Sequence, residues 1–404
     1  MNTQTLDALE SELLQSGMHE SRVEEALART KDFLKTCETR LPSRDEVLQH
    51  FTARPYSGTD WDVGQASDQD YSFSELEEAF FDCLTLGLTA RLWGKPKSES
   101  KGHFERARAI ATYTGDPFFN AQLEFATKLS NDNVLKKLQS DLCNETFNRT
   151  LLKDNKLQEA YSLVATGLEL AQSLSDAKRE LDFLGKAMFA LYEYLNRPHV
   201  ALSLGHYLLS QTRDYRSLHA WTHFHLGNIY LDLQEYNSAK QAFEEALEWA
   251  IASGSAYANM TMYERLGLTC KNLGKLSLAQ QFYEDSLTVA EFHEIKPWLV
   301  ANNQVRCLIG LGLLDLERAK RANAGQKADY LATAENNFKQ AAAIAKQINA
   351  LANEAAALSS LGELYALKEG VGSETSKMYH SMAYRIKKDE LALDPSSDRV
   401  KKDA

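Results

Sequence analysis

The residue types that could carry chemistry are scattered along the chain and form no complete metal-binding motif. His223 and His225 lie two residues apart, which on a helix turns the two rings to different faces and disfavours a metal pair. We interpret both as core or surface histidines. The stretch HEIKP at 293–297 begins like a zinc-protease motif but has no second histidine one turn later, so that motif fails. The sequence predicts neither a metal nor another cofactor.

Phosphate-binding and nucleophilic motifs are also missing from the sequence. The patterns GxxxxGK[ST], GxGxxG and GxSxG do not occur, so neither a phosphate cradle nor a nucleophile elbow is visible. The stretch WGKPKSESKGH at 93–103 lacks the strand and the spacing of a P-loop, and we interpret it as an exposed loop between two helices. These observations predict that the protein is not an enzyme.

The cysteines do not suggest pairing. They are odd in number and lack CxxC spacing, which fits a reducing compartment and no disulfide. Burial on helical faces explains Cys83, Cys270 and Cys307 more simply than reactivity does. The five residues are Cys37, Cys83, Cys143, Cys270 and Cys307.

One stretch shows what kind of element could position side chains in this chain. HFHLGNIYLDLQEYNSAKQAFEEAL at 223–247 places small and bulky residues at fixed offsets. Helices at 221–233 and 237–250, joined by a short polar turn, would bring these residues to facing sides of an antiparallel pair. The small residues would then let the two backbones approach closely. They are Gly227, Ala239 and Ala246, and the bulky ones are Leu226, Tyr230 and Phe243.

The same pattern recurs about forty residues later, in YERLGLTCKNLGKLSLAQQFYEDSL at 263–287. Its matching residues are Leu266, Gly267, Ala279, Tyr283 and Ser286. A fixed period indicates a solenoid, because stacked hairpins bury the apolar surface that a single hairpin leaves bare. The order of Leu-Gly, an aromatic residue, then Ala, Phe and Ala resembles the tetratricopeptide repeat family. This resemblance implies an all-α fold, a right-handed α-solenoid of helix hairpins, with a period of about 40 residues here rather than 34.

Weaker copies of the pattern extend from Gly87 to Gly362, which predicts roughly six or seven helix hairpins. A long helix at 298–321 contains both Gly310 and Gly312 and so allows two registers. Elsewhere the expected glycine of the first helix is missing, so the helices there should pack more widely or at a different angle. The residues at those two positions are Asn148 and Phe189.

We expect three parts in the chain: an N-terminal helical and acidic-aromatic segment at 1–74, the solenoid at 75–390 and a polar tail at 391–404. The first part should begin with a helix near Leu6 to Leu34. The stretch 55–82 holds eight carboxylates and no Lys or Arg, interleaved with aromatic residues. It is either a solvated loop, with Ser74 as the N-cap of the next helix, or an acidic hook that docks on a partner or in the protein's own groove.

The net charge of -11 argues against nucleic acid as a partner, because that affinity depends chiefly on Lys and Arg neutralising phosphates. No apolar run approaches the length of a membrane span, and the N-terminus lacks the pattern of a signal peptide. We therefore expect a cytoplasmic protein that binds another protein or a peptide. Whether it self-associates stays open.

The resemblance also implies a working surface, since the first helix of each repeat lines the concave face in this family. Asn228 stands where many family members use Asn to hold a ligand's backbone, although it could instead cap local polar groups. Phe224 replaces the lysine of the family's carboxylate clamp, which disfavours a co-chaperone, and Trp221 beside it suits an apolar peptide or an amphipathic helix. The candidate partner-binding residues are Trp221, Phe224, Asn228, Leu231, Glu264, Arg265, Leu268 and Lys271.

The sequence thus predicts a non-catalytic adaptor or scaffold that uses the concave face of a solenoid. The alternative is a regulatory subunit that senses a peptide or small ligand and controls a separate effector, such as a protease, a kinase or the transcription machinery. Regulators of that class commonly carry a DNA-binding helix-turn-helix, which the acidic N-terminal region does not resemble. We expect Asn228 and Arg265 to lie outside the core between repeats.

Overall fold

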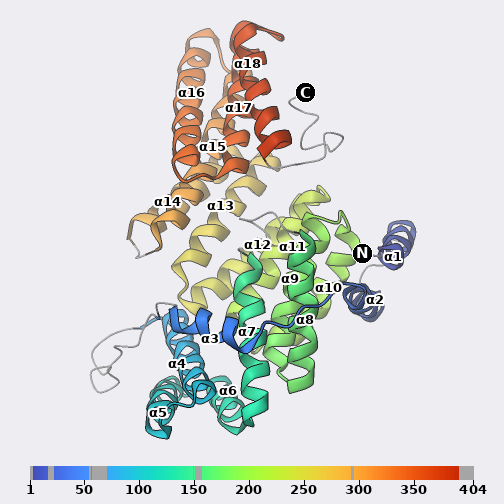
Figure 1. Ribbon diagram of the computed structural model, residues 1–404. Coiled ribbons are helices and arrows are strands. Elements are labelled where there is room, and N and C mark those ends of the chain that lie inside the picture. The colour runs from blue at the N-terminus through green and yellow to red at the C-terminus, as the bar shows by residue number, and fades with distance from the viewer. Residues whose placement is uncertain are drawn as a thin grey trace. The chain divides into compact units, whose positions relative to one another are not determined.

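The described residues of the computed structural model are 3–16, 22–53, 56, 71–148, 150, 157–292 and 295–390. Over these ranges the regular elements are helices, and no strand occurs (Figure 1). The all-α class expected from the sequence is therefore confirmed. None of the described helices is both long and apolar enough to cross a lipid bilayer.

Eighteen α-helices lie in the described part of the chain, followed by a short π-helical turn at Ile386–Glu390. Their bounds are α1 Gln4–Ser16, α2 Val23–Lys35, α3 Arg44–Ala53, α4 Phe73–Trp93, α5 Lys97–Thr114, α6 Pro117–Lys128, α7 Asn131–Asn148, α8 Leu157–Leu174, α9 Ala177–Glu193, α10 Pro198–Thr212, α11 Arg216–Asp232, α12 Tyr236–Ser253, α13 Ala256–Asn272, α14 Leu276–Phe292, α15 Pro297–Arg321, α16 Ala324–Gln347, α17 Leu351–Glu369 and α18 Glu374–Arg385.

The helices form two compact units, each built from consecutive helix pairs. Unit 1 holds residues 1–234 and 248–255, and unit 2 holds residues 235–247 and 256–404. In unit 1, α4 packs with α5, α7 with α8 and α9 with α10; in unit 2, α13 packs with α14, α15 with α16 and α17 with α18. Figure 1 shows α15 to α18 side by side. The expected stack of helix hairpins is confirmed, while the expected boundaries at 74/75 and 390/391 stay predictions.

An aromatic ring of the second helix covers a glycine of the first helix in these pairs. A Cβ built at Gly267 of α13 would lie 2.7 Å from the ring of Tyr283 on α14. In the next pair, a Cβ at Gly312 of α15 would lie 2.5 Å from the ring of Phe338 on α16. Gly312 is therefore the equivalent of Gly267, which settles the register of the long helix. Gly310 instead faces Tyr283 of the preceding pair, at 2.2 Å.

In the pairs whose first helix lacks this glycine, a glycine of the second helix faces the large side chain instead. A Cβ at Gly167 of α8 would lie 2.0 Å from the ring of Phe183 on α9, and a Cβ at Gly205 of α10 would lie 2.4 Å from Leu226 on α11. The large side chain thus comes from the first helix of the next pair. This reversal is the physical reason that Phe189 can stand where glycine was expected, while the side chain of Asn148 lies outside the described part of the structure.

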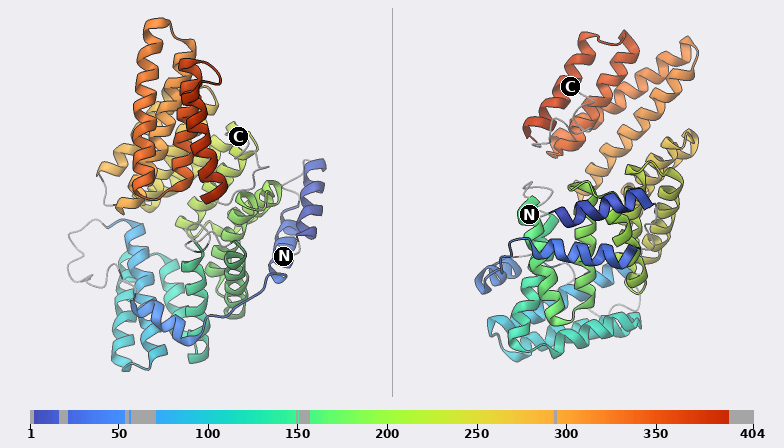
Figure 2. Two further views of the ribbon diagram at one scale, coloured as in Figure 1. Left: turned by 45° about the horizontal axis from the view of Figure 1, so that its top comes forward. Right: turned by 90° about the vertical axis from the view of Figure 1, so that its right-hand side faces the viewer.

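The N-terminal region differs from the expectation of one helix near Leu6 to Leu34, because it contains two helices, α1 and α2. They pack on the second helices α8 and α10 of unit 1 (Figure 2). The Glu10 carboxylate of α1 accepts backbone hydrogen bonds from His199 and Val200 in the first turn of α10, at 3.2 and 3.1 Å. A carboxylate at this position satisfies donors that the helix itself leaves open.

Two local expectations were wrong. Ser72, not Ser74, is the N-cap of α4, in a capping box with Glu75. The stretch 93–103 is mostly helix, since α4 ends at Trp93 and α5 begins at Lys97. The choice between an acidic hook and a solvated loop depends chiefly on residues 57–70, which lie outside the described residues.

The contact between ring and glycine can be tested at Gly267. Gly267→Ala is expected to lower the free energy of unfolding by about 1 to 3 kcal/mol, because the added methyl group overlaps the Tyr283 ring. Gly185 on α9 is a matched control, since nothing lies within 4 Å of a Cβ built there. Gly185→Ala should stabilise by about 0.4 to 1 kcal/mol. Urea titrations followed by circular dichroism measure both changes, and equal effects at the two glycines would disprove the contact.

Candidate functional site

The first helices of successive pairs contact one another within each unit. In unit 1, α4 contacts α7, α7 contacts α9 and α9 contacts α11; in unit 2, α13 contacts α15 and α15 contacts α17. We call these two surfaces the unit-1 first-helix face and the unit-2 first-helix face. They correspond to the surface that the sequence analysis selected.

Four predicted residues lie on α11 at the unit-1 first-helix face. The rings of Trp221 and Phe224 meet edge to face, with 5.1 Å between centroids. Phe224 is buried, whereas Trp221, Asn228 and Leu231 are partly exposed. The Asn228 amide donates a hydrogen bond to the Phe224 carbonyl of its own helix at 3.2 Å. This contact fits the alternative in which Asn228 caps a local polar group. It does not use the side-chain oxygen Oδ1 of Asn228.

A cluster of rings joins these residues to α9. Phe224 lies 5.4 Å from the His225 ring, and His225 lies 5.5 Å from Phe189. Tyr192 packs on Phe189 at 5.6 Å, and its hydroxyl is 3.1 Å from His225 Nδ1. Burial, and next the charge of Lys186, lowers the pKa of His225 to about 3, so this imidazole is neutral at pH 7. The sequence analysis missed Phe189 because it read that position as a failed glycine.

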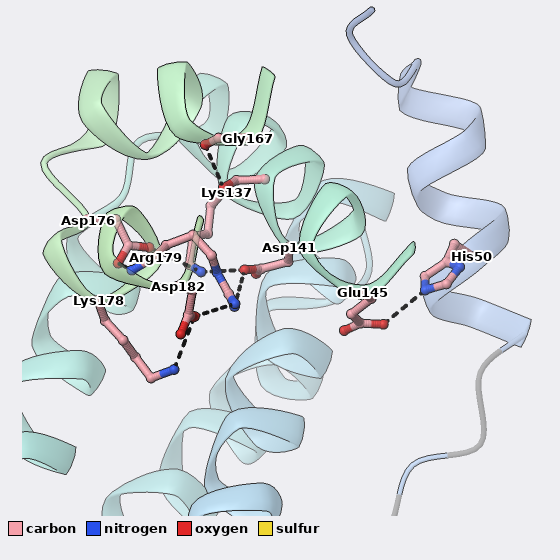
Figure 3. Close-up of polar contacts among 10 residues, drawn as sticks. His50, Lys137, Asp141, Glu145, Gly167, Asp176, Lys178, Arg179 and Asp182 are labelled. Atoms are coloured by element: carbon pink, nitrogen blue, oxygen red, sulfur yellow. Dashed lines mark hydrogen bonds and ion pairs between the residues drawn. The ribbon is translucent and has the colours of Figure 1, made fainter. Parts of the chain in front are cut away.

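A network of ion pairs links α7 to α9 on the same face (Figure 3). The Asp141 carboxylate is 2.6 Å from both Lys137 Nζ and Arg179 Nη2. Lys137 also lies 3.2 Å from Asp176, and Arg179 lies 2.8 Å from Asp182. Each of these side chains is at most 15% exposed. Buried charges need such partners because desolvation penalises them strongly.

The charges of the ion-paired residues in the network cancel one another. Lys178 completes it through Asp182 at 3.3 Å, so three cations face three carboxylates. Burial raises the pKa of the Asp182 carboxyl, but the charges of Lys178 and Arg179 outweigh burial and bring it below its usual value. An adjoining cavity of about 80 Å³ has a mixed lining of apolar and polar side chains, and its charged residues are Asp82, Lys137, Asp141, Glu145 and Arg179. It has room for a few water molecules, so we assign the network a structural role.

Lys186, which also lies on α9, forms none of these ion pairs. It follows Asp182 by one turn, and its ammonium lies 5.1 Å from the centre of the Phe147 ring. Among the described residues it has no ion pair within 4 Å. Burial lowers the pKa of Lys186 to about 8, Asp182 opposes that shift, and Arg179 and Lys178 reinforce it.

The other four predicted residues lie on α13 at the unit-2 first-helix face. Glu264 is buried, at 3% exposure, although it was expected to line a groove. Its Oε2 atom lies 3.4 Å from the Nε atoms of both Arg265 and Arg306. Leu268 and Lys271 are partly exposed. Arg265 is therefore tied to a buried carboxylate, which the sequence analysis did not foresee.

A row of side chains on α15 extends this face beyond the predicted residues. Trp298, Asn302 and Arg306 follow one another at intervals of four residues, so they share one side of the helix. Arg306 pairs with Glu264 of α13, while Asn302 accepts a 2.6 Å hydrogen bond from Asn353 of α17. Trp298 is 60% exposed. The regular spacing was visible in the sequence, but the ambiguity between two glycines in this helix hid its register.

The cysteine thiols are poor candidates for a nucleophile. All five cysteines are buried and free. Burial raises the thiol pKa of Cys83 to about 11 and those of Cys143 and Cys307 to about 12, so the reactive thiolate is scarce at pH 7. No group of three or more His, Cys, Asp or Glu side chains suited to a metal ion occurs within the described ranges.

The lowered pKa of Lys186 makes the free energy of unfolding depend on pH. Below pH 8 this lysine is charged in the folded and unfolded chain alike, and the penalty of the half-buried ammonium is present in full. Between pH 8 and about 10.4 the unfolded chain binds more protons than the folded chain, so the free energy of unfolding rises with pH. Lys186→Met should abolish this rise, while replacement of the exposed Lys136 should leave it. Urea titrations from pH 7 to 10 test this, and an unchanged rise in Lys186→Met would contradict the assignment.

Comparison with known proteins finds a family model that matches part of the chain. Residues 218–291 match the family model described as tetratricopeptide repeat, and no curated protein matches the sequence. BtubC (BKLC) from P. vanneervenii is 15% identical, with 64% of this chain and 92% of that chain covered and a TM-score of 0.35. The apo form of RapI is 12% identical, with 86% and 98% covered and a TM-score of 0.45. YrrB, a tetratricopeptide protein with an unusual peptide-binding site, is 19% identical, with 62% and 96% covered and a TM-score of 0.27.

The family match covers nearly all of α11 to α14, the helices that carry the two clearest repeats and the eight predicted residues. Residues 218–291 are therefore a tetratricopeptide repeat segment within the chain.

Proposed function

We propose that the protein is a non-catalytic adaptor or scaffold that holds a peptide or an extended segment of a partner protein on its first-helix faces. The observation that carries the proposal is the row Trp298, Asn302 and Arg306, which presents an apolar ring, an amide and a cation on one side of α15. Polar groups that fix orientation beside an exposed aromatic anchor are typical of peptide-binding surfaces.

Each member of the row suits a different part of a bound segment. The 60% exposed Trp298 ring would lose most of its contact with water beneath an apolar side chain. Asn302 and Asn353 use one acceptor and one donor on each other, and each amide retains further groups for a peptide backbone. The eight residues selected from the sequence remain part of this proposal, with Glu264 acting through the arginines that it holds.

The cellular location belongs to the same proposal. Five buried, free cysteines suit a reducing compartment, which supports a cytoplasmic protein.

The runner-up function is the regulatory subunit that senses a ligand and controls a separate effector. The two functions differ in one measurable respect, because a regulator must change its affinity for the effector when ligand binds, whereas a scaffold need not.

The choice of variant for a binding test follows from the contacts. Replacing Arg265 by Ala would leave the buried Glu264 with Arg306 as its one ion-pair partner among the described residues, and would confuse binding with stability. Trp298 and Asn302 are partly exposed, and their replacement leaves the core intact. Met378 and Met382 on α18 are exposed by 48% and 43% and provide a matched control on a second helix.

We expect Trp298→Ala with Asn302→Ala to weaken binding of a captured partner by about tenfold or more, because an apolar anchor and a hydrogen-bonding group are lost together. The control, Met378→Ala with Met382→Ala, should bind like the unaltered protein. Full-length proteins are used as bait in native lysate, and the recovered partner is quantified by mass spectrometry. Equal recovery with both double variants would show that the unit-2 first-helix face is not the binding surface.

A further inference from the structure

Two histidine rings of α11 lie against each other. His219 and His223 are four residues apart, so they follow one another along one side of the helix, and their Nε2 atoms are 3.2 Å apart. Both lie just below the surface, at 7% exposure. The sequence analysis considered His223 together with His225, whereas the structure brings His223 to His219. We call His219 and His223 the histidine pair.

Neighbouring helices of unit 1 hold the first ring of the histidine pair in place. The Nδ1 atom of His219 is 2.9 Å from the hydroxyl oxygen of Thr212, the fully buried last residue of α10. The ring of Trp249 on α12 packs on the same imidazole, with 4.6 Å between centroids. When Nδ1–H donates to the Thr212 hydroxyl, the Nε2 atom of His219 presents its lone pair towards His223. Histidines that bind metal ions are typically oriented by such a hydrogen bond from the other ring nitrogen.

The separation of the two Nε2 atoms suits a chelated ion. In the neutral pair one proton must lie between them, because two lone pairs at this distance repel each other and two N–H groups clash. A cation can take the place of that proton. Two zinc–nitrogen bonds of about 2.0–2.1 Å at a tetrahedral angle place their nitrogens about 3.3 Å apart. The observed 3.2 Å therefore needs little change to accept an ion.

We propose that the histidine pair binds a divalent transition-metal ion, with zinc as the type case, through both Nε2 atoms. Imidazole nitrogen suits zinc, whereas magnesium and calcium prefer oxygen ligands. The pair fills two of four tetrahedral positions, since no group of three or more candidate ligands occurs among the described residues. Water or a donor from a bound molecule completes the coordination. The proposal is independent of the adaptor function.

The sequence around the pair favours metal binding over hydrolysis. Zinc-protease helices carry two histidines at this spacing with a glutamate directly after the first, and that glutamate is the general base. Here the stretch is HAWTH at 219–223, so Ala220 stands in the place of the glutamate. We therefore assign the ion a binding role that needs no catalytic base.

Calorimetry with zinc chloride tests the proposal. The full chain is freed of metal by dialysis against a chelator and titrated at neutral pH, and we expect a tight site for one ion per chain. His219→Gln and His223→Gln should each weaken this site by about tenfold or more, because a single imidazole replaces the chelate. His103→Gln changes a partly exposed histidine of α5 and should bind like the unaltered chain. Magnesium chloride should give no comparable binding.

Two further measurements keep both imidazoles and so do not depend on the folding of the histidine variants. Thr212→Val removes the orienting hydroxyl and should weaken zinc binding by about tenfold, while Thr212→Ser keeps the hydroxyl and the affinity. Copper(II) added to the unaltered chain should show two coordinated nitrogens by electron paramagnetic resonance.

The contrary results are equally definite. If the unaltered chain has no tight zinc site, or if both His219→Gln and His223→Gln keep its affinity, the 3.2 Å contact is a hydrogen bond alone and the inference is overturned. A copper signal with fewer than two nitrogens overturns it as well, and so does a loss of zinc binding in His103→Gln. None of these results bears on the proposed adaptor function.

Discussion

The packing of an aromatic ring over a glycine sets the spacing of the helices on which the rest depends. Tyr283 shows this most clearly, because its ring fills the gap at Gly267 in its own pair and the gap at Gly310 in the next. One side chain thereby fixes α13 against α15. The same two helices supply Glu264 and Arg306, whose 3.4 Å pairing requires that spacing. Burial, and next the Glu264 charge, holds the pKa of Tyr283 well above its usual value.

The two first-helix faces use charge in opposite ways. In unit 1 the ion pairs of Asp141, Arg179 and their neighbours are complete, so they rigidify α7 and α9 and have little to offer a ligand. In unit 2, Arg265 and Arg306 have more hydrogen-bond donors than the described residues use. A buried and unbalanced charge is costly to maintain, and such groups concentrate at functional sites. This contrast directs the binding proposal to unit 2.

Much of the fold could be predicted from the sequence, because Gly227 and Gly267 mark two repeats in the same register. The N-cap of α4 could not be predicted, since both Ser72 and Ser74 are followed three residues later by a glutamate, Glu75 and Glu77, and the local sequence does not choose between these two capping-box patterns. The site was predicted in part. Arg265 was selected, but its pairing through Glu264 with a residue about forty positions away depends on the register of α15, which Gly310 and Gly312 left ambiguous.

The central claim is that a partner segment binds on the first-helix faces, and photocrosslinking tests it most directly. A benzoylphenylalanine in place of Trp298 keeps an exposed aromatic group on α15, and the same group in place of Met378 lies on α18. The account predicts that the probe on α15 forms a covalent adduct with the captured partner and that the probe on α18 does not. Adducts from the α18 probe alone, or equal adducts from both, would contradict it.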